Sequence, residues 1–277
     1  MATVMSTGFG AGFHAAPDKA VDGSAYDRWT GRWSRLFLPA VLAAAHVEPG
    51  CRLLDVSTGT GEAACMALPL VGIEGSVVGA DISPEMLASA RARLQGSPFL
   101  AVAADGQALP FGDASFDAVV CQLGLQFFPD PARGVGEFRR VLRKDGRVAI
   151  CVISTPDQAP MWGNLADVLS RFLPDLRDVL FLSFALNDPH RLEGMLAGAG
   201  FREVRVERTT REDSFESFAD YWQPIEAGVG SIPQAYLRLA AADRRAVREE
   251  VRARLARFER DGRLSMSVEM LIGSGRA

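Results

Sequence analysis

Short, largely apolar runs recur through the middle of the chain and alternate with stretches of helical character. They cover residues 53–56, 77–80, 99–103, 117–121 and 148–153. In the stretches between them, apolar side chains recur three and four residues apart, as they do along one face of a helix. Short apolar runs are typical of strands buried on both faces, and strands that alternate with helices build parallel sheets covered by helices. The pattern therefore predicts an α/β fold with a doubly wound, mostly parallel sheet.

Beyond residue 153 the pattern changes to longer helical stretches. Apolar residues at helical spacing predict helices within residues 156–187 and 215–258, and a similar stretch at 23–45 precedes the first strand. No internal repeat or low-complexity linker separates these stretches from the rest of the chain. We therefore expect a single domain over residues 23–277, with the three stretches as helical cap segments.

Two further strands are expected after residue 200. Val204 and Val206 alternate with charged residues, and apolar residues alternate with polar ones over 264–272, as in strands with one exposed face. At the other end of the chain, residues 1–22 are rich in glycine, alanine and threonine. This composition predicts a poorly ordered N-terminal segment.

Composition narrows the class of protein. The 277 residues carry a formal net charge of −4 and the sequence pI is about 5.5, which argues against a nucleic-acid surface. The chain does not open with a basic cluster and an apolar core, as a signal peptide would, and no apolar run reaches membrane-spanning length. We therefore expect a cytoplasmic protein that acts on a small molecule, in an oligomeric state that the composition leaves open.

The cysteines and histidines show neither metal-binding nor disulfide spacing. Four cysteines and three histidines are scattered along the chain, with no C-x-x-C pair. Zinc sites and disulfide frameworks both depend on closer and more regular spacing. We therefore expect no metal, and reduced, mostly buried thiols at Cys51, Cys65, Cys121 and Cys151.

A glycine-rich turn after the first predicted strand carries the clearest chemical signal. Asp55 lies near the end of that strand, Ser57, Gly59 and Gly61 follow, and a helix-compatible run of small residues begins at Glu62. Glycine lets the backbone turn sharply and lets a ligand approach closely. A helix that starts after such a turn points free N–H groups into it, which favours a nucleotide-like ligand.

This turn alone is compatible with two classes of enzyme. Residues 59–64 fit the G-x-G-x-x-A form of the NAD-binding fingerprint. Residues 55–61, with Asp55 four residues ahead of Gly59, instead resemble the first motif, D/E-x-G-x-G-x-G, of the seven-stranded, Rossmann-like methyltransferases that use S-adenosylmethionine (SAM). Ser57 replaces the first glycine of that motif. Asp81 does not decide between the classes, because both place an acid at the end of the second strand for the ribose hydroxyls.

Later strand ends add to the resemblance. Residues 105–111 and 116–120 resemble the methyltransferase stretch D-x-x-x-L-P-F followed by F-D-x-V, and residues 122–130 resemble the segment after the fourth strand. Residues 141–146 are similar to the V-L-K-P-G-G turn of the family, with Lys and Asp in place of Pro and Gly. Together these motifs resemble small-molecule methyltransferases of the quinone-biosynthesis type (methyltransferase type 11). The resemblance implies a seven-stranded sheet with an antiparallel last strand and SAM as cofactor, and it disfavours an NAD-linked oxidoreductase.

The same resemblance assigns cofactor contacts to the carboxyl ends of the strands, where ligands bind in open α/β sheets. Asp81 is expected at the ribose, Ile82 and Met86 beside the adenine, and Asp105 at the exocyclic amine of the adenine. A Y-x-x-W segment lies over the cofactor in similar methyltransferases, which adds two N-terminal residues; packing of this segment on the domain is the alternative. The predicted cofactor-binding set is Tyr26, Arg32, Asp55, Ser57, Gly59, Gly61, Asp81, Ile82, Met86, Ala104, Asp105, Gly106, Gln122 and Leu123.

The acceptor is expected to be small and partly apolar, because methionine and aromatic side chains gather in the segments that interrupt the sheet pattern. Its predicted pocket comprises Gln126, Met161, Trp162, Phe181, Phe184, Tyr221 and Trp222, and ordinary core packing is the alternative for each of the apolar ones. We predict methyl transfer by direct in-line displacement. A SAM-binding protein that catalyses a non-methylating reaction is the alternative. No catalytic base is assigned, because His190, in the first turn of a predicted helix, is expected to be exposed.

Overall fold

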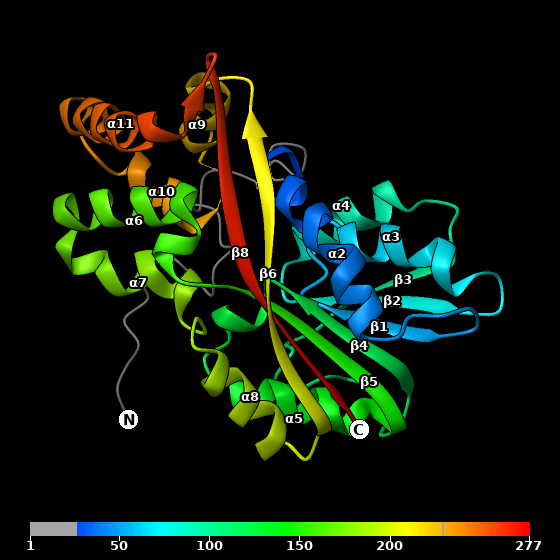
Figure 1. The fold of residues 1–277 in the computed structure, drawn as a ribbon. Helices are drawn as coiled ribbons and strands as arrows, with labels where there is room; N and C mark the ends of the chain where they lie inside the picture. The colour runs from blue at the N-terminus through cyan, green and yellow to red at the C-terminus, as the bar shows by residue number, and fades with distance from the viewer. Residues whose placement is uncertain (1–26, 229) are drawn as a thin grey trace.

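The computed structural model describes residues 27–228 and 230–277 (Figure 1). Its centre is an eight-stranded sheet in the order β3-β2-β1-β4-β5-β8-β6, with β7 paired to β8. Strands β1 to β5 run parallel to one another, and β8 runs antiparallel to both β5 and β6. The strands are β1 (Arg52–Val56), β2 (Ser76–Asp81), β3 (Phe99–Ala103), β4 (Phe116–Gln122), β5 (Leu142–Ile153), β6 (Arg202–Phe215), β7 (Glu259–Arg260) and β8 (Arg263–Arg276).

Helices cover both faces of this sheet, as the alternating pattern predicts. Helices α2, α3 and α4 pack on one face, and α5 and α8 pack on the other (Figure 1). The predicted Rossmann-like fold, mostly parallel and with an antiparallel last strand, is therefore confirmed. The helices are α2 (Arg32–Ala44), α3 (Glu62–Val71), α4 (Pro84–Arg93), α5 (Pro131–Val141), α6 (Pro160–Phe172), α7 (Arg177–Phe181), α8 (Pro189–Gly198), α9 (Phe218–Glu226), α10 (Ser231–Leu237) and α11 (Ala241–Leu255); the π-helix η1 (Asp27–Gly31) precedes α2.

The central strands are buried on both sides because successive side chains alternate between two apolar cores. Leu53 points into the core beneath α2 and α3, and Leu54 points into the core beneath α5 and α8. On the neighbouring strand β4, Val120 points into the core beneath α2 and α3, and Val119 points into the core beneath α5 and α8. This two-sided burial explains why the sequence of these strands reads as apolar runs rather than as alternating ones.

Three helices begin at a capping side chain followed by proline. Ser83 accepts a hydrogen bond from the backbone N–H of Met86 ahead of α4. Asp130 and Asp188 cap α5 and α8 in the same way. Proline is favoured in the next position because it needs no hydrogen-bond partner there and its φ suits a helix. These caps fix where α4 and α5 start, close to the carboxyl edge of the sheet.

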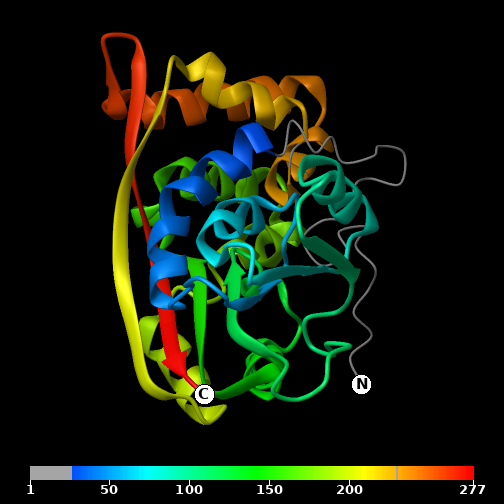
Figure 2. The same ribbon diagram turned by 90° about the vertical axis from the view of Figure 1, so that its right-hand side faces the viewer.

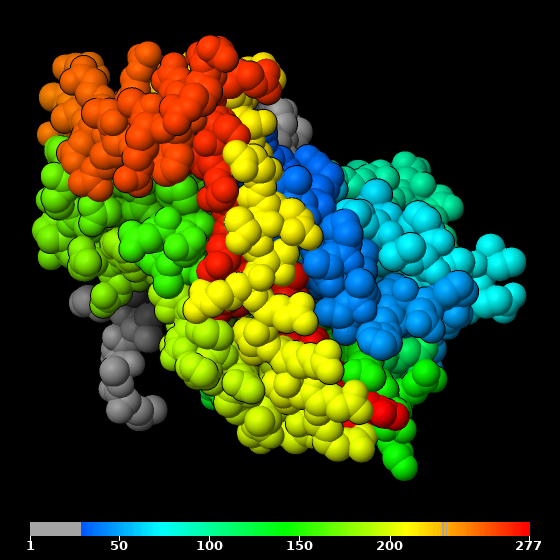
Figure 3. Space-filling model, viewed as in Figure 1, coloured from blue at the N-terminus to red at the C-terminus, as the bar shows by residue number. Residues whose placement is uncertain are grey.

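Five of the helices that follow β5 and β6 form a separate layer, here called the cap (α6, α7, α9, α10 and α11). Strands β6 and β8 pair at Arg202 opposite Arg276 and, after an irregularity, from Arg205 opposite Ser274 to Phe215 opposite Leu264, whereas β5 pairs β8 only as far as Met270. The two long strands thus run past the end of β5 and up to the cap (Figure 2). Helices α6 and α9 pack against this extension, and α6 packs on α11. The cap lies beside the β6–β8 strands in the space-filling view (Figure 3).

The expectation of a poorly ordered segment at residues 1–22 lies outside the described residues. Within residues 27–228 and 230–277, no helix combines the length and the apolar character needed to cross a membrane.

Candidate functional site

The glycine turn after β1 combines three left-handed backbone positions. Ser57 has φ of 59°, Gly59 of 56° and Gly61 of 82°. The turn is closed by a hydrogen bond from the Gly61 N–H to the Thr58 carbonyl (2.9 Å), and α3 starts directly after it at Glu62. Glycine takes such φ values freely, whereas a serine is strained there. Ser57 therefore occupies a position whose backbone conformation suits the glycine that the methyltransferase motif carries.

Two acidic side chains hold the loops that follow β1 and β2. Asp81 accepts hydrogen bonds from the N–H groups of Gly59 (2.8 Å) and Ser83 (2.9 Å) and so joins the two loops. Asp55 is buried and accepts a hydrogen bond from the Thr58 hydroxyl (2.6 Å). Burial away from water raises the pKa of Asp55 to about 7, and it also raises the pKa of Asp81.

A cavity with about 690 Å³ of empty space, part of it open to solvent, lies at the carboxyl ends of β1 to β4. We call it the larger cavity, in comparison with a smaller one that adjoins it. Its polar lining includes Asp81 and Asp105, and its apolar lining includes Ile82, whose side chain is 53% exposed. An exposed apolar side chain in a hollow is suited to contact a flat apolar ligand. The predicted cofactor-binding residues that line it are Ser57, Gly59, Asp81, Ile82, Met86, Ala104, Asp105, Gly106, Gln122 and Leu123.

A second, smaller hollow of about 390 Å³ adjoins the first. The two share part of their lining, namely Ser57, Gly59, Gln122 and Leu123. Asp55 lines this smaller cavity from β1. Its opposite wall comes from Thr30, Gly31 and Ser34 of η1 and α2. The aromatic N-terminal stretch indicated that this segment approaches the site, but nothing in the sequence singled out these three small residues.

The remaining predicted cofactor residues have other positions. Gly61 is buried below the turn, where a Cβ would lie 3.1 Å from Leu94. Arg32 lines neither cavity: its Nε donates to Asp213 Oδ1 (2.9 Å), and its guanidinium lies 4.2 Å from the centre of the Phe215 ring. The prediction that Arg32 covers the cofactor is therefore not supported, since Asp213 and Phe215 hold it against β6. Tyr26 lies outside the described residues.

The segment after β4 contributes more to the site than the sequence indicated. Phe127, Phe128 and Pro129 line the larger cavity together with Gly106. A Cβ on Gly106 would lie 2.3 Å from the Phe128 ring, so only glycine allows these two segments to meet. The resemblance over residues 122–130 included these positions, and their aromatic character was the signal that could have identified them.

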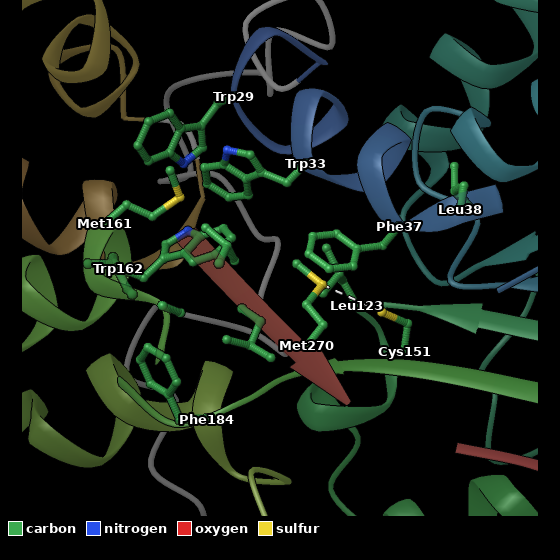
Figure 4. Packing of buried hydrophobic residues seen from close by; sticks show 14 of the residues in the cluster. Trp29, Trp33, Phe37, Leu38, Leu123, Cys151, Met161, Trp162, Phe184 and Met270 are labelled. Atoms are coloured by element: carbon green, nitrogen blue, oxygen red, sulfur yellow. Dashed lines mark hydrogen bonds between the residues drawn. The ribbon is translucent and has the colours of Figure 1, made fainter. Parts of the chain in front are cut away.

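The aromatic residues predicted to surround the acceptor pack inside the cap. The Tyr221 hydroxyl donates to the Met161 carbonyl (2.6 Å), and the Trp162 ring centre lies 3.6 Å from that of Trp33. Figure 4 shows Met161, Trp162 and Phe184 among such packed side chains. The apolar core beneath α2 and α3 continues into the cap and includes these side chains. Five of the residues predicted for the acceptor pocket are thus buried and line neither cavity, namely Met161, Trp162, Phe184, Tyr221 and Trp222, and their contact with an acceptor stays a prediction.

Three other predictions concern residues away from the cavities. Phe181 is partly buried in α7 and lines neither cavity. His190 has a side chain that is 89% exposed, as the sequence predicts, and its Nδ1 lies 3.8 Å from Glu193 Oε2. The four cysteines are free thiols, of which Cys65 alone is exposed. In the described part of the chain, no group of histidine, cysteine and acidic side chains has the arrangement of a metal site.

Comparison with known proteins identifies the family. Residues 54–150 match the family model described as "Methyltransferase domain". The ubiquinone/menaquinone biosynthesis C-methyltransferase UbiE of Teredinibacter turnerae is 31% identical over 205 residues, which cover 66% of this chain and 80% of the relative. The demethylmenaquinone methyltransferase of Thermus thermophilus is 35% identical over 192 residues, which cover 65% of this chain and 84% of the relative.

Solved structures show the same fold at lower sequence identity. The YcgJ protein of Bacillus subtilis matches with a TM-score of 0.58 at 18% identity, over 87% of this chain and 98% of that one. The phosphoethanolamine N-methyltransferase 2 of Haemonchus contortus, solved with SAM, matches with a TM-score of 0.58 at 17% identity, over 92% of this chain and 56% of that one. With the strand order, the glycine turn and the relatives in agreement, the chain belongs to the Rossmann-like SAM-dependent methyltransferases and uses S-adenosylmethionine as its cofactor.

Proposed function

We propose that this methyltransferase transfers the methyl group of SAM, by direct in-line displacement, to a small, partly apolar acceptor. The proposal rests on one observation: the two cavities meet at Gln122 and Leu123. One cavity suits the nucleoside of the cofactor and the other suits its amino-acid end, so the reacting sulfur belongs at the place where they join.

The larger cavity suits the adenosine. The Asp81 carboxylate, fixed by two backbone N–H groups, can accept hydrogen bonds from ribose hydroxyls. Ile82 and Met86 offer apolar surface to the adenine, and Asp105 and Gly106 line the same cavity. Asp105 is held in place by hydrogen bonds from the backbone N–H (2.9 Å) and side-chain amide (3.1 Å) of Gln107.

The smaller cavity suits a group that carries both an ammonium and a carboxylate. The buried Asp55 carboxyl is positioned to pair with a cation, which would compensate its desolvation. Backbone positions with φ of 56° at Gly59 and 59° at Ser57 bring the chain close to the ligand there. We assign the methionine end of the cofactor to this cavity.

Gln122 is positioned to orient the reacting centre. Its Nε2 donates to the Ser34 carbonyl of α2 (3.2 Å), and its Oε1 is buried without a hydrogen-bond partner. SAM, when bound, supplies a methyl group on a positively charged sulfur. The negative end of the Gln122 amide dipole suits a positive charge at this position, and a fixed dipole in a site that excludes water acts strongly.

The part of the larger cavity's lining that is not assigned to the cofactor supports a neutral acceptor. It includes the apolar side chains of Phe127 and Phe128, and no lysine or arginine of the described residues lines either cavity. Arginine or lysine would be needed to bind a phosphorylated or polyanionic acceptor. The relatives are named for ubiquinone and menaquinone biosynthesis, so we propose a quinol-like hydroxylated aromatic as the acceptor and a ring carbon as the methylated atom.

A screen with radiolabelled SAM tests this function. The purified enzyme is offered 1,4-naphthohydroquinone under anaerobic conditions, other neutral aromatics, a phosphorylated amine, RNA and total cell protein. Transfer of label to a neutral aromatic, with the new methyl located on carbon by mass spectrometry and NMR, is the expected result. Transfer confined to a macromolecule or to a phosphorylated compound would overturn the proposed acceptor class. Binding of SAM with no transfer to any of them would favour the non-methylating alternative.

A further inference from the structure

Gln126 has a buried amide with no hydrogen-bond partner at all. The residue is 2% exposed, and both heavy atoms of the amide, Nε2 and Oε1, are fully buried and unpaired. Buried polar groups in folded proteins are nearly always hydrogen-bonded, because an unpaired one has lost its water without compensation. An amide left in this state points to a ligand that pairs with it.

The position of Gln126 places that ligand between the reacting centre and the cap. Gln126 is the middle residue of the 3₁₀-helix η2 (Leu125–Phe127), which follows β4. Leu123 and Gly124 before it line the larger cavity, as does Phe127 after it. On its other side η2 packs against η5 (Leu182–Phe184) of the segment that leads from the cap to α8.

The side chains of η2 point in different directions, since a 3₁₀-helix has three residues per turn. Leu125 is buried in the core beneath α5 and α8, and Phe127 faces the larger cavity. Gln126 takes the third direction, and η5 is one of the elements that η2 packs against, together with α5 and β5. The buried side chains of η5 are the apolar Phe184 and the hydroxyl-bearing Ser183, and the Gln126 amide is hydrogen-bonded to neither.

We propose that the amide of Gln126 binds an oxygen of the acceptor, and that the acceptor is therefore a neutral aromatic with a free hydroxyl or carbonyl on an otherwise apolar body. A glutamine amide both donates and accepts, so it complements a hydroxyl group in either role. An apolar wall with one such amide favours an acceptor whose oxygen is free over one whose oxygen is blocked. This inference rests on the proposed function, and it adds a specificity-determining residue and a required functional group.

The test compares wild type with Gln126→Leu, using the same anaerobic assay with 1,4-naphthohydroquinone. Leucine removes the unpaired amide and keeps the bulk. We expect the midpoint of thermal unfolding to stay or rise by about 2–8 °C, SAM affinity to stay unchanged, and kcat/KM for the acceptor to fall about 10- to 100-fold. Gln126→Met gives a second apolar variant in case leucine's branched shape prevents folding. Gln158→Leu, the same change at an exposed site outside both cavities, is the matched control and should alter none of these quantities.

A binding measurement distinguishes recognition of the acceptor's oxygen by Gln126 from a purely structural role of this residue. Calorimetry in the presence of S-adenosylhomocysteine compares 1,4-naphthohydroquinone with its dimethyl ether. Wild type should prefer the hydroquinone by about tenfold or more, and Gln126→Leu should lose that preference. If wild type methylates the hydroquinone and Gln126→Leu does so equally well, the inference is overturned and the proposed function stands. If wild type methylates no hydroxylated or carbonyl-bearing aromatic, the proposed function itself fails. A variant that loses both stability and SAM affinity would show that Gln126 is structural.

Discussion

Ser57 and Gly124 share one small space between the ends of β1 and β4. A Cβ on Gly124 would lie 2.3 Å from the Cβ of Ser57 and 2.4 Å from its hydroxyl oxygen. Ser57 also has a left-handed φ of 59°, a conformation that glycine takes without cost. Ser57 replaces a glycine of the methyltransferase motif, and the space for its side chain is left by Gly124, which has none.

The first prediction is that these two positions are energetically coupled. Gly124→Ala alone should destabilise the protein by about 1–3 kcal/mol, because the new methyl group overlaps Ser57. In the background of Ser57→Gly the same change should cost at least about 1 kcal/mol less. Urea unfolding of wild type, both single variants and the double variant measures this coupling.

A control at another glycine separates coupling from general effects. Gly136 lies in α5, where an added Cβ would meet no neighbouring side chain within 4 Å, so Gly136→Ala should stabilise the helix by about 0.5–1 kcal/mol. Its effect should be the same with serine or glycine at position 57. Strictly additive free energies for the Ser57 and Gly124 changes would contradict the shared space.

The second prediction concerns Asp81 and SAM. Asp81→Ala removes the proposed ribose acceptor and should weaken SAM binding by roughly 10- to 100-fold. Asp117→Ala is the matched control: its carboxylate also accepts a backbone N–H, from Arg52 (2.7 Å), but at the opposite edge of the sheet. Calorimetric titration should show a change in SAM affinity for the first variant only. Equal SAM affinity in folded Asp81→Ala would remove Asp81 from the site.

The third prediction is a pH dependence of SAM affinity that arises from Asp55. Burial raises the pKa of this carboxyl to about 7 in the free protein, and a cationic ammonium beside it favours the ionised form. Below pH 7 the proton must leave before the ammonium can pair, so affinity should fall up to about tenfold per pH unit from pH 7 toward pH 5.5. Titrations across this range measure the slope.

The same carboxyl should affect stability in the opposite direction. Its folded pKa lies above its unfolded value, so between about pH 4 and pH 7 the folded protein holds a proton that the unfolded chain has released. The contribution of Asp55 to the free energy of unfolding is therefore largest at low pH and is lost as the pH rises to 7. Asp55→Asn should flatten both pH profiles, and a profile that Asp55→Asn leaves unchanged would assign the dependence to another group.

The fourth prediction concerns the link between α2 and β6. Asp213 is 4% exposed, and burial raises its pKa even though Arg32 lies 2.9 Å away. Arg32→Met leaves this buried carboxyl without its cation and should cost about 1–3 kcal/mol, given that Arg32 itself is partly exposed. Because Thr30 and Ser34 form the wall of the smaller cavity, SAM should also dissociate faster, which stopped-flow fluorescence can follow.

Two further variants check the origin of that effect. Arg32→Met combined with Asp213→Asn should regain part of the lost stability, since the unpaired charge is gone. Arg248→Met breaks an exposed pair with Glu226 at 3.6 Å and should change stability by less than about 1 kcal/mol. Equal losses for Arg32→Met and Arg248→Met would show that the buried pair has no special role.

The sheet and the cofactor edge could be predicted because both depend on local patterns. Strands such as Phe99–Ala103 are marked by short apolar runs, and parallel strands bring their carboxyl ends to one edge wherever their neighbours lie. Asp81 and Gln122 therefore reach one cavity although they lie far apart in the chain. The family motifs supplied the identity of the ligand at that edge.

The acceptor side could not be predicted because it depends on contacts between distant segments. Trp33 meets Trp162 only after the cap has folded against α2, and apolar residues at helical spacing serve a core and a pocket equally well. In the sequence, Tyr221 and Trp222 cannot be distinguished from aromatic residues that line a pocket. Their burial follows from the helices that surround them, which no single stretch of sequence encodes.

The long β6–β8 pair restricts how the site can open. A hinge needs a crossing where few residues join two bodies and where backbone angles can change freely. Here the cap packs on two long strands that stay paired to each other from Arg205 to Phe215, so moving the cap away from the site would bend or break this strand pair. The N-terminal wall is a single π-helical turn held by the packing of Trp29 against Phe215 and Tyr221, and its displacement would break no strand pairing. We therefore expect ligands to enter and leave the site beneath η1, and backbone hydrogen exchange to be faster in η1 than along β8.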